Sequence, residues 1–131
     1  MITIIPLNNI GSDARGATYT FQNERTGEFI FIIRKPGSIS GNEYHTGKHP
    51  YKNPEKIILL SGEALVEWVN MQNDEAGEMT IEGPAAVCIP SMVWHRITAI
   101  SDLMILEQNG LDAAKDTIKL LQHPHLQKVT L

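Results

Sequence analysis

The sequence lacks several features that would assign the chain to a familiar class. It has one cysteine, so an intramolecular disulfide is excluded. No apolar run approaches the roughly 20 residues that a membrane-spanning helix requires. Basic residues are scattered, and the net charge is −4, which argues against binding nucleic acid or an anionic membrane surface. The N-terminus has no basic segment ahead of its apolar residues, so we expect a cytoplasmic protein.

Common catalytic signatures are missing as well. The sequence contains no Gly-x-Ser-x-Gly turn, no glycine-rich phosphate loop and no closely spaced pair of cysteines. Serine hydrolases with a nucleophile elbow, P-loop nucleotidases and cysteine-ligated zinc sites are therefore not indicated.

What the sequence does contain is a series of short apolar runs separated by turn residues, which is typical of β-strands. Strands are expected at residues 3–5, 17–22, 28–34, 42–45, 56–61, 64–71, 79–82, 86–89, 94–99 and 103–108. Apolar residues at helical spacing predict one helix over 111–121, although 117–121 also fits a final strand. The 131 residues are enough for one domain.

Two strand patterns indicate a barrel that is covered on its outside. Along residues 63–70, Ala64, Val66 and Trp68 share one face, and acidic residues occupy the other. Residues 29–33 and 57–60 are apolar on both faces, so both faces must be buried. We expect a homodimer, because a second copy could provide the outer cover.

Four side chains of the metal-ligand type occur on or beside these strands. Glu43 and His45 are two residues apart and point to the same side of a strand. Glu55 opens the next strand, and His95 lies on a later one. Two imidazoles with one or two carboxylates suit a divalent ion such as Zn²⁺, Fe²⁺, Mn²⁺, Ni²⁺ or Co²⁺.

The role of Glu43 has three interpretations: a metal ligand, a general base beside the ion, or an exposed charge. Without Glu43, the remaining His45, Glu55 and His95 form the two-histidine, one-carboxylate set that is typical of non-haem iron.

The loop between the first two candidate strands adds further polar groups. His49 is an alternative ligand, or a lid or proton donor over the site. Tyr51 and Lys52 could meet an anionic substrate, but ordinary loop polarity explains them as well, and we favour it. The candidate catalytic residues are Glu43, His49 and Tyr51.

The spacing of these residues resembles the two motifs of the cupin superfamily. The matching positions are Gly37, Glu43, His45, Glu55 and Gly62 for the first motif, and Gly83, Pro90 and His95 for the second. Glu43 stands where the first motif usually has a histidine. The resemblance implies a double-stranded β-helix, or jelly-roll barrel, over residues 1–131, with the motifs at about 37–62 and 83–99.

A narrower likeness is carried by Gly-Asn-Glu-Tyr-His at 41–45 and by Glu-Lys-Ile at 55–57. These runs are similar to Gly-Asn-His-Tyr-His and Glu-Lys-Phe in cupin domains of bacterial capsule-sugar enzymes. The likeness implies a nucleotide-sugar epimerase or ketoisomerase acting on a small 4-keto sugar. In such an enzyme the ion would polarise the ketone oxygen, and Glu43 or His49 would move the neighbouring proton. An iron dioxygenase-type cupin and a non-enzymatic module that binds a small ligand or a metal remain alternatives.

Overall fold

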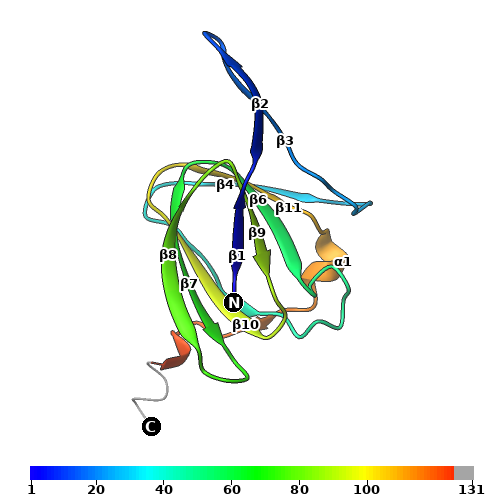
Figure 1. The fold of residues 1–131 in the computed structure, drawn as a ribbon. Coiled ribbons are helices and arrows are strands. Elements are labelled where there is room, and N and C mark those ends of the chain that lie inside the picture. Colours follow the sequence, from blue (N-terminus) through cyan, green and yellow to red (C-terminus); the bar gives the residue numbers. More distant parts are fainter. Residues whose placement is uncertain (126–131) are drawn as a thin grey trace.

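Two antiparallel five-stranded sheets pack against each other, and a hairpin projects from them (Figure 1). The computed structural model describes residues 1–125. The first sheet has the spatial order β1 (Thr3–Pro6), β9 (Ala85–Ile89), β6 (Glu55–Ser61), β11 (Leu103–Glu107) and β4 (Ile30–Arg34). The second has the order β12 (Ile118–Lys119), β5 (Ile39–Tyr44), β10 (Val93–Ala99), β7 (Glu63–Asn70) and β8 (Ala76–Glu82). The projecting hairpin consists of β2 (Asn8–Asp13) and β3 (Gly16–Thr20).

The predicted all-β architecture is confirmed, with two differences. Strand β2 was not expected, because its sequence Asn-Asn-Ile-Gly-Ser-Asp has no alternating apolar face. The helix predicted over 111–121 forms only its first turn, α1 (Leu111–Ala114), and the alternative of a final strand within 117–121 corresponds to β12. Among the described residues, no helix has the length and apolar character needed to cross a membrane.

The core lies between the sheets and follows the period-two pattern of the strands. Ala64 and Val66 on β7 are 0% and 1% exposed, as the alternation predicted. They pack with buried residues of the facing sheet, including Ile57 and Val87. Burying one such aliphatic side chain contributes about 1.5–3 kcal/mol, so the alternating faces alone favour this pairing of sheets.

The two strands that are apolar on both faces differ in their cover. On β6, Ile57 and Ile58 point to opposite faces, and both are buried. On β4, by contrast, Phe31 and Ile33 are 52% and 65% exposed. The first sheet therefore has a partly uncovered apolar outer face in the single chain.

Strand pairing brings the candidate residues together. In the ladder between β5 and β10, His95 lies opposite Glu43. Gly41 on β5 has φ +90°, and a Cβ there would lie 2.7 Å from the carbonyl oxygen of His95. A glycine at this position lets the two backbones approach closely and so fixes the distance between the candidate residues.

Candidate functional site

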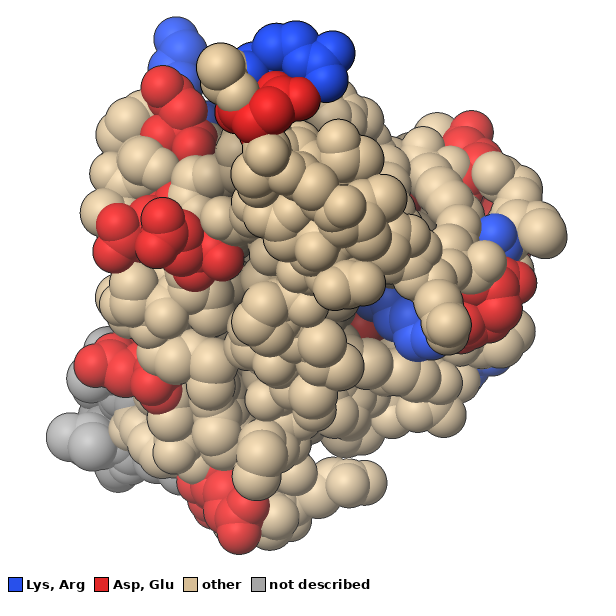
Figure 2. All heavy atoms as spheres, turned by 45° about the horizontal axis from the view of Figure 1, so that its top comes forward, with Lys and Arg blue, Asp and Glu red and all other residues tan. Residues whose placement is uncertain are grey.

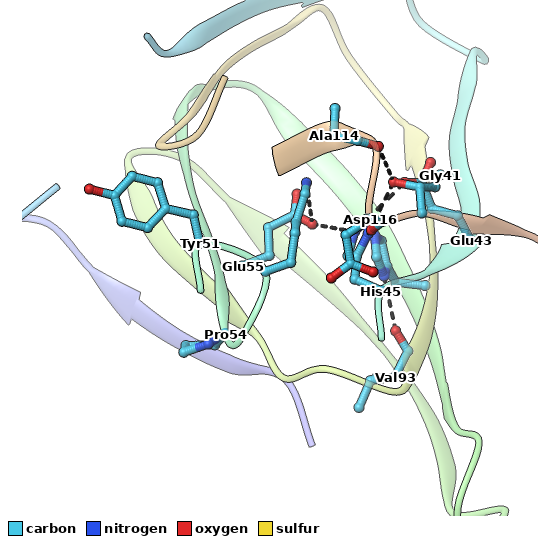
Figure 3. Close-up of polar contacts among 12 residues, drawn as sticks. Gly41, Glu43, His45, Tyr51, Pro54, Glu55, Val93, Ala114 and Asp116 are labelled. Carbon is cyan, nitrogen blue, oxygen red and sulfur yellow. Dashed lines mark hydrogen bonds and ion pairs between the residues drawn. The ribbon is translucent and has the colours of Figure 1, made fainter. Parts of the chain in front are cut away.

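His45 is held by its inner ring nitrogen, which fixes its tautomer. It is 1% exposed, and its Nδ1 lies 2.7 Å from the backbone carbonyl oxygen of Asp116. Because a carbonyl only accepts, Nδ1 must carry the hydrogen. The opposite nitrogen, Nε2, pairs with the carboxylate of Glu55 and also faces that of Glu43. Figure 3 shows His45 between Asp116 and Glu55.

His95 is arranged in the same way. It is 4% exposed, and its Nδ1 donates to the backbone carbonyl of Val93 over 3.1 Å. Its ring centroid lies 5.3 Å from that of His45. Each imidazole therefore uses Nδ1 to bind the backbone and turns Nε2 toward the carboxylates of the cluster.

Two carboxylates complete the cluster. One oxygen of Glu43 lies 3.7 Å from Nε2 of His45, and the other accepts from Lys119 over 2.6 Å. The Glu55 carboxylate makes an ion pair with His45 and lies 3.1 Å from the ammonium of Lys52. One ligand atom each from Glu43, His45 and His95 lies within 4.8 Å of the other two.

The surroundings push the pKa values of the two histidines in opposite directions. Burial lowers the pKa of His45, but its hydrogen bond with Glu55 and the charge of that carboxylate outweigh burial and raise the pKa overall. Burial lowers the pKa of His95, against the opposing effect of Glu55. Burial also disfavours the ionised form of Glu55, yet its contacts with His45, His95 and Lys52 lower its pKa to about 2. His45 therefore holds a proton more readily than His95 does.

A third carboxyl, that of Glu107, lines the cavity that contains Glu43, Glu55 and His95. This cavity has a volume of about 50 Å³, room for an ion or a water molecule. Burial and the neighbouring carboxylates raise the pKa of Glu107. Glu107 was not among the residues predicted from the sequence, although it shares the inward parity of Ile105 on the same strand.

His49 and Tyr51 lie apart from this cluster and have partners of their own. The Nδ1 of His49 accepts from the amide of Tyr51, and its Nε2 lies 3.5 Å from the exposed carboxylate of Asp112. The Tyr51 hydroxyl accepts from the amide of Thr26, and its ring packs under the guanidinium of Arg25. In Figure 3 the Tyr51 ring points away from the other side chains. Of the candidate residues, the structure thus brings together Glu43, His45, Glu55 and His95.

Two further residues of the site were not recognised from the sequence. Lys52, for which we favoured ordinary loop polarity, is 2% exposed and binds Glu55. Asp116 was not singled out at all, although its carboxylate binds the amides of Thr46, Gly47 and His49. No local signal in the sequence relates Asp116 to a loop some 70 residues earlier.

The donor set fits a divalent ion at three of the four predicted positions. One ring nitrogen each of the buried His45 and His95 shares a centre with a carboxylate oxygen of Glu43. Imidazole and carboxylate donors suit borderline divalent ions. Glu55 differs, because an ammonium and an imidazole already bind its carboxylate.

Comparisons with known proteins agree with this architecture. The family model described as polysaccharide biosynthesis C-terminal domain matches residues 11–128. Among curated proteins, none matches the sequence significantly.

Several solved structures have the same fold. A mutant of the 3,4-ketoisomerase QdtA from Thermoanaerobacterium thermosaccharolyticum, in complex with TDP-4-keto-6-deoxyglucose, is 15% identical, with a TM-score of 0.68 over 90% of this chain and 86% of that chain. A mutant of the 3'-monoepimerase ChmJ from Streptomyces bikiniensis, in complex with dTDP, is 13% identical, with a TM-score of 0.72 over 99% and 73%. The capsular polysaccharide assembling protein CapF from Staphylococcus aureus is 25% identical, with a TM-score of 0.57. The match covers 88% of this chain and 32% of CapF. The cupin jelly roll expected from the sequence is thereby confirmed.

Proposed function

This chain belongs to the polysaccharide biosynthesis C-terminal domain family and has the cupin fold, and we propose that it isomerises or epimerises a nucleotide-linked keto sugar. One observation carries the proposal. Two imidazoles with ring centroids 5.3 Å apart, each tied to the backbone through Nδ1 and each close to the carboxylates of Glu43 and Glu55, have pKa values that are pushed in opposite directions. The solved QdtA complex supports the choice of substrate class, since its ligand is a TDP-linked 4-keto sugar.

Both reactions move a proton next to a ketone. An isomerase removes a proton from the carbon beside the carbonyl and returns one to a neighbouring position, whereas an epimerase returns it to the opposite face of the same carbon. His95, kept neutral by burial, can accept a proton at Nε2. His45, whose pKa is raised by Glu55, is better suited to donate one. Paired groups whose pKa values are pushed apart suit the roles of base and acid.

The mouth of the cavity offers the contacts for the rest of the substrate. A sugar ring is larger than the cavity, so we expect it to bind at Glu43, whose side chain is 18% exposed. The Lys119 side chain, 60% exposed, makes an ion pair with Glu43 in the structure. When a nucleotide sugar binds, the Lys119 ammonium could pair with its diphosphate instead. This change of partner would release Glu43 to act as a second base.

We also propose that Glu43, His45 and His95 hold a divalent ion. The ion, when bound, supplies a Lewis acid that polarises a ketone oxygen. Glu107 lies outside this donor set and in the same cavity, and its raised pKa allows it to hold a proton closer to neutral pH. Glu43 cannot serve as ligand and base at once, and His45 cannot donate a proton from Nε2 while that atom binds the ion, so in the ion-bound protein Glu107 is the remaining acid in the cavity.

The same three donors support a second candidate, an iron dioxygenase. Two histidines and one carboxylate within 4.8 Å form the ligand pattern of non-haem iron enzymes. Oxygen uptake by the Fe²⁺-loaded protein in the presence of an organic substrate would favour this candidate over proton transfer.

Proton exchange with solvent tests the proposed isomerase or epimerase directly. In D₂O, the protein should incorporate deuterium beside the ketone of TDP-4-keto-6-deoxyglucose, because the abstracted proton is replaced from solvent. Proton NMR measures this as loss of the signal at that carbon, and TDP-glucose, which has no ketone, is the control. The proposal fails if no signal is lost from a panel of TDP-, UDP- and GDP-linked keto sugars, with and without added divalent ions.

We further propose that the protein is a homodimer joined through the outer face of the first sheet. Met104 lies opposite Ile33 in the β4–β11 ladder, and both are more than 40% exposed. The β2–β3 hairpin is exposed along its whole length, and isolated hairpins are barely stable in water. In the view of Figure 2, a broad area without charged side chains occupies the centre of the surface. A second copy of the chain would cover both the apolar outer face of the first sheet and the exposed hairpin.

Replacing Ile33 with aspartate should convert the dimer into monomers, because a charge would be buried in the apolar interface. Sedimentation velocity at about 10 µM gives the mass of each species. Leu121→Asp is the matched control, since Leu121 is 71% exposed and lies outside this face. A wild-type protein that sediments as a monomer would contradict the proposed dimer.

A further inference from the structure

Lys52 is a buried lysine at the edge of the cavity. Its side chain is 3% exposed, and its ammonium lies 3.1 Å from one oxygen of Glu55, which is itself 4% exposed. Lysine is almost never fully buried unless it has a charged partner, because the ammonium loses its hydration. The buried Lys52–Glu55 ion pair is therefore part of the site, and ordinary loop polarity does not explain Lys52.

Two separate clamps fix the loop that carries Lys52. At its beginning, the Asp116 carboxylate accepts hydrogen bonds from the amides of Thr46, Gly47 and His49. At its end, the buried guanidinium of Arg25 donates to the carbonyl oxygens of Tyr51 and Pro54. The loop is tied on both sides of Lys52, so the backbone of this residue is held in place beside Glu55.

The same carboxylate oxygen of Glu55 that faces His45 also binds Lys52. A carboxylate oxygen held by a fixed ammonium is a poor ligand for a second cation, because the two positive charges repel each other at close range. Cupin spacing makes Glu55 the expected fourth ligand, yet the chain places its own cation there.

We infer that Lys52 is the resident counter-cation of Glu55 and limits the divalent-ion site to the three donors Glu43, His45 and His95. The inference rests on the ion site proposed above. Lys52 is a positioning residue, since it acts on the ion through Glu55. It keeps a negative charge beside His45 while it weakens the affinity of the cavity for divalent ions.

Lys52→Met tests this inference, because methionine keeps the length of the side chain and removes the charge. With Glu55 free to become a fourth ligand, the variant should bind Mn²⁺ about 10- to 100-fold more tightly than the wild type, the range seen when groups next to metal ligands are altered. Titration followed by electron paramagnetic resonance, which counts free Mn²⁺, gives both dissociation constants. Equal or weaker binding by Lys52→Met overturns the inference.

The double variant Lys52→Met/Glu55→Gln is the matched control. It also lacks the charge of Lys52, but it has no carboxylate at position 55, so its Mn²⁺ affinity should return to that of the wild type. Affinity as high as that of Lys52→Met would overturn the inference, because Glu55 would then not be the added ligand.

If the Lys52→Met variant fails to fold, the inference can still be tested through the effect of Mn²⁺ on folding. If the unpaired Glu55 prevents folding, added Mn²⁺ should restore it, as seen by circular dichroism, while the double variant should fold without any ion. Failure of Mn²⁺ to restore folding overturns the inference. Turnover does not enter these measurements, so a negative result in the deuterium assay and a negative result here are independent.

Discussion

Replacing His45 with asparagine should lower the turnover of a keto-sugar nucleotide by about 10³-fold, within the range of 10²–10⁴ that acid–base groups contribute. The substitution removes Nε2, which faces both carboxylates and the shared centre with His95. The asparagine amide can still donate to the carbonyl of Asp116, so the fold should remain. Initial rates by NMR and thermal unfolding measure the two effects separately.

His49→Asn is the matched control for this substitution. His49 lies in the neighbouring loop, and its side chain contacts the Tyr51 amide and Asp112 but none of the cluster. The two variants therefore separate the predicted roles of His45 and His49. If His49→Asn lowered turnover as much as His45→Asn, His49 would be the residue that transfers the proton, which is one of the interpretations of the sequence.

Neighbouring residues could be predicted from the sequence where they share one face of a strand. Glu43 and His45 share a strand face, and antiparallel pairing places His95 opposite Glu43. Alternation is a property of short segments, so it can be recognised without any knowledge of tertiary contacts. The pairing of β10 with β5 joins distant segments, and only the resemblance to the cupin motifs implied it. The same reasoning identified the buried face of β7 from Ala64 and Val66.

The burial of Lys52 could not be predicted in this way. It depends on Asp116 and Arg25, which hold the loop from distant parts of the chain. A lysine three residues before a glutamate is common on protein surfaces, so the local sequence gives no reason to bury it. The choice between helix and final strand after residue 114 depends on the same distant contacts, because the Asp116 carboxylate binds the 46–49 loop just before β12 begins.

Replacing Asp116 with asparagine should lower the free energy of unfolding by about 3 kcal/mol. Its two carboxylate oxygens accept from Thr46, Gly47 and His49, and hydrogen bonds to a charged group contribute about 1.5–3 kcal/mol each before losses overlap. An asparagine would turn an NH₂ group toward at least one of these amides. Urea unfolding at pH 7 measures the loss, and Asp112→Asn, at a carboxylate 82% exposed, is the control. A loss below about 1 kcal/mol would contradict this role.

The difference in stability between wild type and Asp116→Asn should depend on pH in a predictable way. Although burial raises the pKa of Asp116, its bonds to Thr46, His49 and Gly47 lower it from 3.8 to about 2 in the folded protein. A carboxyl with a lowered folded-state pKa stabilises the protein fully above its unfolded value, and this contribution is lost as the pH falls toward the folded value. The difference should therefore be constant between pH 7 and 5 and shrink below pH 4. Glu55, whose pKa is also about 2, is present in both proteins and cancels in the comparison. A difference that stays unchanged at pH 3 would show that Asp116 stabilises the loop without its charge.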